Sequence, residues 1–133
     1  DLTSSLTKLD ETNPYLKRKA KLFALNNNKS LIKESYNVKT VRLNDVIKKN
    51  NIKKINLLKI DTEGHELEVL QGLNKSIKHT QFILIEFHRD KIYFNYNPRK
   101  IHNYLIKNNF VLEDTFRFPF TYWEDRLYKN KKF

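Results

Sequence analysis

Hydrophobic and polar positions change their period most clearly in the middle of the chain. Ile55 to Ile60 is a near-continuous apolar run, which is typical of a parallel strand covered on both faces. Apolar residues then recur at helical spacing, at Leu67, Leu70 and Leu73. This change of period predicts a buried strand that runs directly into a helix over Glu63 to Gln71.

Charged residues crowd the junction between this strand and this helix. Asp61 or Thr62 can cap the helix start, and Glu63 and Glu66 fall in its expected first turn, where the helix dipole favours negative charge. Glu66 can also reach back to hold the loop, and Gly72 is expected to end the helix. Because open parallel sheets bind ligands outside the carboxyl ends of their strands, a functional site is predicted here.

The rest of the chain alternates between short strand-like and helix-like segments. This order indicates an α/β fold with a parallel sheet, and the last two strands, which have no helix between them, should form an antiparallel pair. The predicted helical segments are Tyr15 to Leu25, Asn44 to Asn50, Asn74 to His79 (a short helix or turn) and Pro98 to Asn108; the predicted strands are Tyr36 to Leu43, Phe82 to Phe87, Phe110 to Phe118 and Tyr122 to Lys129.

Polar side chains follow the apolar part of both central strands. Strand residues alternate in facing, so Lys59 and Asp61 share one face of the first strand, and Glu86 and His88 share one face of the second. A right-handed crossover would make these strands parallel neighbours and bring the four side chains to one crevice. Two carboxylates, an ammonium group and an imidazole can hold a hydroxyl group and take its proton. We therefore predict these four residues to be catalytic.

Each of these residues also has a purely structural interpretation. Asp61 could serve only as a helix cap, and Lys59 could extend out of the sheet and pair with Glu63 or Asp61. His88 could be an ordinary surface histidine. The acids and His88 could also hold a divalent cation, but their spacing is weak evidence for one, and no metal site is predicted.

The pattern K-I-D-x-E-G-x-E-x-x-V-L-x-G, from Lys59 to Gly72, resembles the signature of FkbM-type methyltransferases. Val41 to Ile47 (V-R-L-N-D-V-I) is similar to the segment that precedes this strand in the family. Phe82 to His88 (F-I-L-I-E-F-H) is similar to the family's next strand, which typically ends in an acid and often a histidine. The resemblance covers residues 41–133 and implies the C-terminal half of a Rossmann-like methyltransferase sheet, with residues 1–40 as a weakly defined N-terminal segment.

The resemblance implies methylation that depends on S-adenosylmethionine, at a hydroxyl group of a sugar, glycolipid or secondary metabolite. It also implies that Asp61, Glu63 and Gly64 contribute to cofactor binding. In the family this cofactor binds at a glycine-rich loop, whereas Gly64 and Gly72 are the only glycines of this sequence. We therefore expect a partial domain, from a longer protein, that lacks the main cofactor-binding elements and is inactive alone.

Charge adds an alternative to this interpretation. The chain has 26 Lys and Arg against 15 Asp and Glu, a formal net charge of +11, which could indicate binding to nucleic acid or an anionic surface. Aromatic residues between Tyr93 and Trp123 could stack on bases, although packing of the last hairpin on the sheet explains them better. The alternative function is therefore a non-catalytic, basic α/β module that binds nucleic acid or a partner.

Composition also bears on the expected location of the protein. The sequence contains no cysteine, which suits a reducing compartment. It shows no signal peptide and no stretch near the roughly 20 apolar residues that a membrane-spanning helix needs. We therefore expect a cytoplasmic protein without a transmembrane segment; the sequence does not indicate an oligomeric state.

Overall fold

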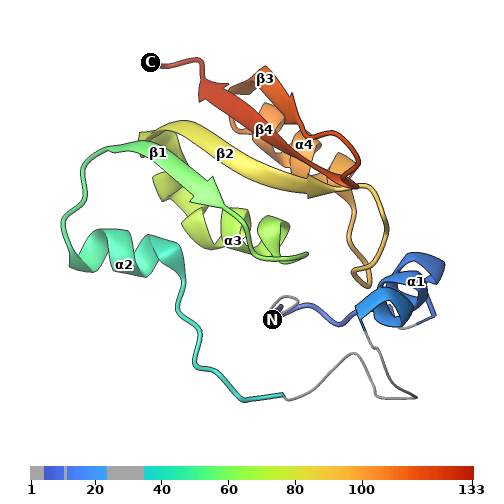
Figure 1. Ribbon diagram of the computed structural model, residues 1–133. Helices are drawn as coiled ribbons and strands as arrows, with labels where there is room; N and C mark the ends of the chain where they lie inside the picture. The colour runs from blue at the N-terminus through green and yellow to red at the C-terminus, as the bar shows by residue number, and fades with distance from the viewer. Residues whose placement is uncertain (1–4, 11, 24–34) are drawn as a thin grey trace.

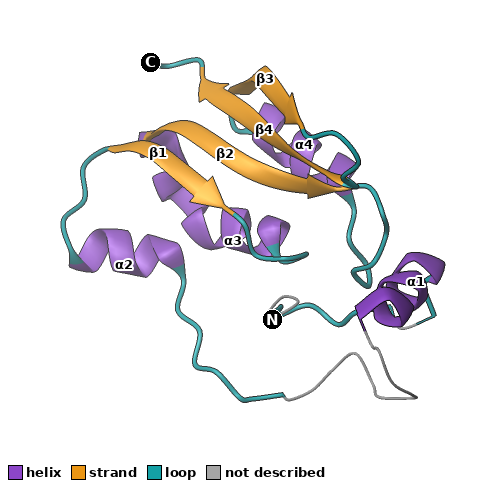
Figure 2. Cartoon of the chain, viewed as in Figure 1, coloured by secondary structure: helices purple, strands orange, loops and turns teal. Residues whose placement is uncertain are grey.

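The computed structural model describes residues 5–10, 12–23 and 35–133, and it has a four-stranded mixed sheet with helices packed against one face (Figures 1 and 2). Within these ranges no helix combines the length and apolar character that crossing a membrane requires. The elements in chain order are α1 (Pro14–Phe23), α2 (Leu43–Lys49), β1 (Ile55–Ile60), α3 (Glu66–Leu73), the 3-10 helix η1 (Asn74–His79), β2 (Thr80–His88), α4 (Pro98–Lys107), β3 (Phe110–Arg117) and β4 (Trp123–Asn130).

The sheet has the strand order β1-β2-β4-β3. β1 and β2 are parallel, with Ile55 opposite Thr80 and Ile60 opposite Ile85. β4 pairs antiparallel with both β2 and β3. The predicted parallel neighbours and the predicted antiparallel pair are therefore confirmed. The carboxyl ends of β1 and β2 emerge at the same edge of the sheet, where the candidate site was expected.

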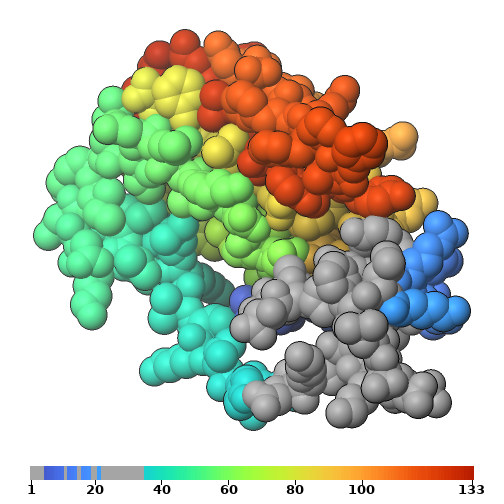
Figure 3. All heavy atoms as spheres, viewed as in Figure 1, coloured from blue at the N-terminus to red at the C-terminus, as the bar shows by residue number. Residues whose placement is uncertain are grey.

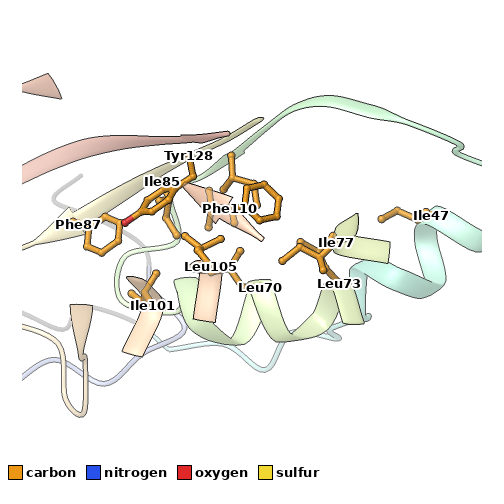
Figure 4. Packing of buried hydrophobic residues seen from close by; sticks show 12 residues of the cluster. Ile47, Leu70, Leu73, Ile77, Ile85, Phe87, Ile101, Leu105, Phe110 and Tyr128 are labelled. Carbon is orange, nitrogen blue, oxygen red and sulfur yellow. The ribbon is translucent and has the colours of Figure 1, made fainter. Parts of the chain in front are cut away.

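The hydrophobic core lies between this sheet and helices α3 and α4. Leu70 of α3 and Leu105 of α4 are fully buried, and Figure 4 shows them close to Phe110 and Tyr128 of the sheet. Pro98 begins α4, and the side chain of Asn97 accepts a hydrogen bond from the amide of Lys100, which is a typical N-cap. The buried cluster consists of Ile47, Ile60, Leu70, Leu73, Ile77, Ile83, Ile85, Phe87, Ile101, Leu105, Phe110 and Tyr128.

The opposite face of the sheet is not covered by the described helices. The expectation that β1 is buried on both faces is wrong for this part of the chain, because Leu57 is 55% exposed and Lys59 also faces solvent. β1 is an edge strand. Ile60 is its fully buried residue, and Ile55 and Leu58 are partly buried against the core. Figure 3, in the orientation of Figure 1, shows atoms of β1, β2 and the β3–β4 hairpin on this side of the molecule.

Two predicted segments differ from the structure before β1. Residues 36–42 of the predicted strand from Tyr36 to Leu43 form no regular secondary structure, and Leu43 begins α2. Asn44 was expected to start this helix but lies inside it and accepts a hydrogen bond of 2.8 Å from the hydroxyl of Ser76. The helix predicted from Tyr15 is present as α1, and its expected end at Leu25 lies outside the described residues.

A buried carboxylate joins the two antiparallel strands at the end of the sheet. The side chain of Glu124 is 1% exposed; its Oε1 lies 2.6 Å from Nη2 of Arg126, and its Oε2 lies 3.0 Å from Nε of Arg117. Burial alone would raise the pKa of this carboxyl, but hydrogen bonds from both arginines outweigh burial and hold the pKa below its usual value. The ion pair therefore stabilises the hairpin only while Glu124 is charged.

Glu124→Gln should lower the free energy of unfolding at pH 7 by on the order of 2 kcal/mol, because a buried charge-assisted hydrogen-bond acceptor is lost. A depressed pKa stabilises the protein above the ordinary glutamate value of about 4.3, and this contribution is lost as the pH falls through the folded-state pKa. The difference between wild type and variant should therefore shrink toward pH 3. Denaturant unfolding at both pH values measures it, with the exposed Glu113→Gln as control. An equal difference at both pH values would contradict the prediction.

Candidate active site

The loop between β1 and α3 is built around a buried glutamate. Glu66 is fully buried, and its Oε1 accepts hydrogen bonds from the amide of Thr62 (3.2 Å), the hydroxyl of Thr62 (3.2 Å) and the amide of Gly64 (3.0 Å). The expectation that Glu66 holds the loop is confirmed. The helix begins at Glu66, three residues later than predicted, because Glu63 (φ 53°) and Gly64 (φ 94°) have left-handed backbone conformations that a helix cannot contain.

The end of β2 carries two polar side chains that are buried rather than exposed. Glu86 is 9% exposed and His88 is 5% exposed. The rings of Tyr93 and Tyr96 contact the His88 ring edge-on, with centroids 4.8 and 5.8 Å away. The amide of His88 also donates a hydrogen bond to the hydroxyl of Tyr96. The loop after β2 therefore closes over the end of its own strand.

The four residues predicted to be catalytic lie at this edge in two adjoining groups. Nζ of Lys59 lies 3.5 Å from Oδ2 of Asp61, and both side chains are more than two-fifths exposed. Nε2 of His88 lies 3.1 Å from Oε2 of Glu86. The charges of Asp61 and Lys59 both act on Glu86, which joins the two groups. The four side chains thus lie together at one edge of the sheet, as an exposed pair in front of a buried pair.

Burial and neighbouring charges shift the protonation of the buried pair. Burial raises the pKa of the Glu86 carboxyl, and the carboxylate of Asp61 raises it further, whereas His88 acts in the opposite direction. Burial alone would lower the pKa of the His88 imidazole, but the Glu86 carboxylate outweighs burial, and this pKa lies above its usual value. Both pKa values are thus raised, so each group of this pair holds its proton to a higher pH than it would in water.

Lys59 is held by two acids, one directly after its own strand and one on β4, on the far side of β2. In addition to Asp61, its Nζ lies 3.0 Å from Oδ1 of Asp125 on β4. Burial would lower the pKa of Lys59, but these carboxylates raise it above its usual value. Sequence reasoning foresaw the pairing with Asp61 but missed Asp125, whose position opposite Glu86 depends on the register between β2 and β4.

Tyr93 is the other residue that the sequence did not identify. Its hydroxyl donates a hydrogen bond to Oε2 of Glu63, and its pKa is raised by burial and by that carboxylate, so it stays a donor. Residues near the N-terminus hold the Tyr93 loop: the amide of Phe94 donates to the carbonyl of Lys8, and Leu9 forms a β-bridge with Tyr93. The aromatic residues after β2 are visible in the sequence, but nothing in the sequence indicates that Tyr93 pairs with Glu63 in the distant loop.

The immediate surroundings of Gly64 bear on the predicted binding of S-adenosylmethionine. The space beside Gly64, which was predicted to receive the cofactor, is filled by the ring of Tyr93, whose Cγ lies 2.5 Å from where a Cβ would stand. Gly72 lies within α3, so the helix end predicted there is wrong; the helix ends at Leu73, and the positive φ at the C-cap belongs to Asn74. The roles of Asp61, Glu63 and Gly64 in cofactor binding remain predictions.

Two open cavities lie away from the candidate site. One of about 420 Å³ is lined by residues of α2 and η1, including Asn44, Ser76 and His79. The other, of about 570 Å³, lies between η1 and α4 and includes Tyr104 and Lys107. Neither includes any of the candidate residues at the carboxyl ends of β1 and β2. The polar edge formed by Lys59, Asp61, Glu86 and His88 thus lies outside these two cavities and combines an exposed pair with a buried pair.

Comparisons with known proteins agree with the resemblance of the central motif. The family described as the Methyltransferase FkbM domain matches residues 6–112. The hexuronic acid methyltransferase AglP of Haloferax volcanii is 35% identical to this chain over 54 residues, which are 41% of this chain and 23% of AglP. The matched segment thus spans about a quarter of that relative's length. No solved structure is significantly similar.

Proposed function

Because the chain belongs to the FkbM methyltransferase family, we propose that it is the C-terminal part of a methyltransferase that uses S-adenosylmethionine and methylates a hydroxyl group of a sugar, glycolipid or secondary metabolite. The sheet then corresponds to the C-terminal half of a Rossmann-like methyltransferase sheet. Because Tyr93 fills the space beside Gly64, we propose that the chain contributes chiefly the acceptor side of the site, with Asp61, Glu63 and Gly64 next to the bound cofactor. We further propose that residues 1–133 are inactive alone and that the protein acts in the cytoplasm.

The observation that carries this proposal is the position of Asp61. Its carboxylate follows β1 directly, lies at the carboxyl edge of the sheet and is 46% exposed beside Lys59. An acceptor hydroxyl that enters at this edge meets Asp61 before it meets the buried pair behind it. The geometry therefore supports Asp61 as the group that accepts the hydroxyl proton.

The neighbouring residues position Asp61 and receive its proton. Lys59, held by Asp125 on β4 across the intervening strand β2, fixes one side of the Asp61 carboxylate. Glu86 lies behind Asp61 and already has a raised pKa, so a proton passed inward has an acceptor there. His88 balances the negative charge of the two acids. We propose Asp61 as the catalytic base and the other three residues as its positioning and proton-holding partners.

The charge of the site favours a hydroxyl acceptor over a carboxylate acceptor. AglP is named as a hexuronic acid methyltransferase, and a hexuronic acid carries both groups. The carboxylates of Asp61, Glu86 and Glu63 cluster at this edge, and Lys59 is already paired with two acids. A carboxylate acceptor would add like charge to this cluster, whereas a hydroxyl group can donate its hydrogen to Asp61.

The product of methyl transfer tests the proposal. The full-length protein that the proposal implies would be incubated with methyl-labelled S-adenosylmethionine and a hexuronic acid glycoside, alongside the matched neutral hexose glycoside. We expect label in both products, as a methyl ether that survives mild alkali. A label confined to the hexuronic acid and released by alkali would be a methyl ester, and it would contradict the hydroxyl assignment.

One observation favours the alternative of a nucleic-acid-binding module. The β3–β4 turn presents Phe118, Phe120 and Tyr122 to solvent, each at least 45% exposed, near Arg117. The packing of hairpin aromatics on the sheet that the sequence suggested therefore does not hold for Phe120, which is fully exposed, whereas Phe118 packs on Trp123 of β4. RNA binding that weakens steeply with salt and is lost in Phe120→Ala, without any methyl transfer, would support this alternative.

A further inference from the structure

We propose that Glu63, Glu86 and His88 form a binding site for one divalent transition-metal ion. One side-chain atom from each residue lies within 4.8 Å of the other two. Nε2 of His88 lies 3.1 Å from Oε2 of Glu86 and 3.7 Å from Oε2 of Glu63. Ligand atoms held about 2.1 Å from one ion lie about 3.0–3.5 Å apart, so small side-chain rotations would complete the geometry.

The buried nitrogen of His88 is an independent reason for the proposal. His88 is 5% exposed, and Nε2 has no hydrogen-bond partner among the described residues, although the two carboxylates lie close to it. Oε2 of Glu86, 3.1 Å away, forms an ion pair with Nε2. A buried polar atom without a partner is costly, and a metal ion between Nε2 and the carboxylates would satisfy it.

The surrounding residues hold these ligands as a metal site requires. Tyr93 donates its hydroxyl hydrogen to Glu63 and packs edge-on against the ring of His88. Glu66 fixes the loop that carries Glu63 through its hydrogen bond to Gly64. Such outer partners orient metal ligands and commonly change metal affinity by about 10- to 100-fold. Glu63 is 22% exposed, which leaves a route for the ion from solvent.

The ligand set selects the class of ion. An imidazole with two carboxylates suits Mn²⁺, Fe²⁺ or Zn²⁺ better than Mg²⁺ or Ca²⁺, which prefer oxygen ligands alone. Three protein ligands leave open positions that water or a substrate oxygen can take. The consequence for catalysis rests on the proposed function: an ion behind Asp61 would supply the positive charge that protonated His88 otherwise provides. Metal binding itself does not rest on it.

Titration of the metal-free chain with Mn²⁺, followed by electron paramagnetic resonance, tests the proposal. We expect one site per chain, and a loss of affinity of at least about 100-fold in His88→Gln and in Glu63→Gln, because a direct ligand contributes more than an outer partner. His65→Gln is the matched control: Nδ1 of His65 lies 3.8 Å from Oε2 of the exposed Glu68, outside the cluster. Circular dichroism would establish that each variant is folded.

The outcomes separate the metal site from the proposed function. Weak binding of several ions that is the same in His88→Gln and His65→Gln would overturn the metal site, whether or not the full-length protein transfers methyl groups. Stoichiometric binding lost only in the cluster variants would support it even if no methyl transfer were found. If His88→Gln unfolds the chain, Glu63→Gln and Glu86→Gln decide the question, since both replace a carboxylate by a side chain of equal size.

Discussion

Gly64→Val is expected to destabilise the protein by about 3–5 kcal/mol, because a strained backbone and an overpacked contact add together. Gly64 has a φ of 94°, a conformation that L side chains rarely adopt. A Cβ at this position would stand 2.5 to 2.8 Å from three atoms of Tyr93, a buried residue. Denaturant unfolding of wild type and variant measures the loss, which is a large share of the stability of a domain of this size.

Gly72→Ala is the matched control for Gly64→Val. Gly72 lies within α3, and the nearest atom to a new Cβ is the backbone nitrogen of Leu43 at an ordinary 3.7 Å. Alanine should therefore be tolerated, with a gain of up to about 1 kcal/mol from helix propensity. Tyr93→Ala in the Gly64→Val background should recover part of the lost stability. Equal stability of the two glycine variants would show that Tyr93 does not fill the space beside Gly64.

The strands of the sheet could be predicted because their signals are local. The apolar run from Ile55 to Ile60 coincides with β1, and alternation of facing placed Glu86 and His88 on one side of β2. Pro98 also marked the start of α4 correctly. In each case the residue pattern itself fixes the element, and the right-handed crossover then determines that β1 and β2 are neighbours.

The features that the sequence did not predict depend on contacts between distant segments. Glu63 looked like a first-turn helix residue, but Glu66 bonds backward to Gly64 and delays the helix. Tyr93 reaches Glu63 from the loop after β2, thirty residues away in sequence. No periodicity encodes such a contact. The sequence therefore predicted that the candidate residues share one edge of the sheet, but it did not predict the environment of each side chain.

His88 illustrates this limit most clearly. Its position after an apolar strand suggested an accessible residue, in a crevice or at the surface. In the structure His88 is 5% exposed and lies against the rings of Tyr93 and Tyr96. Removal of its side chain would leave a cavity, so His88→Ala would test stability and catalysis together. His88→Gln is the better variant, and Asp61 is the better position for a test of catalysis alone.

Asp61→Asn is expected to reduce the turnover of methyl transfer by about 100- to 10,000-fold, the usual contribution of a general base. The amide keeps the shape of the side chain but cannot take the proton of an acceptor hydroxyl. Stability should change by less than about 1 kcal/mol, because the ion pair with Lys59 is exposed on both sides. Single-turnover methyl transfer by the full-length protein, with denaturant unfolding in parallel, measures both quantities.

Asp125→Asn shows whether Asp61 acts as a base or only pairs with Lys59, because Asp125 shares the second role but not the first. Asp125 also pairs with Lys59, at 3.0 Å, but lies on β4 and does not follow the strand end at which the acceptor is proposed to enter. If Asp61 acts as the base, Asp125→Asn should lower turnover no more than about tenfold, a loss of about 1.4 kcal/mol in transition-state stabilisation. Equal losses in both variants would mean that the two acids only hold Lys59. Wild-type turnover in Asp61→Asn would show that Asp61 does not take the proton. The buried pair of Glu86 and His88 would then be the remaining proton acceptor among the four candidate residues at this edge of the sheet.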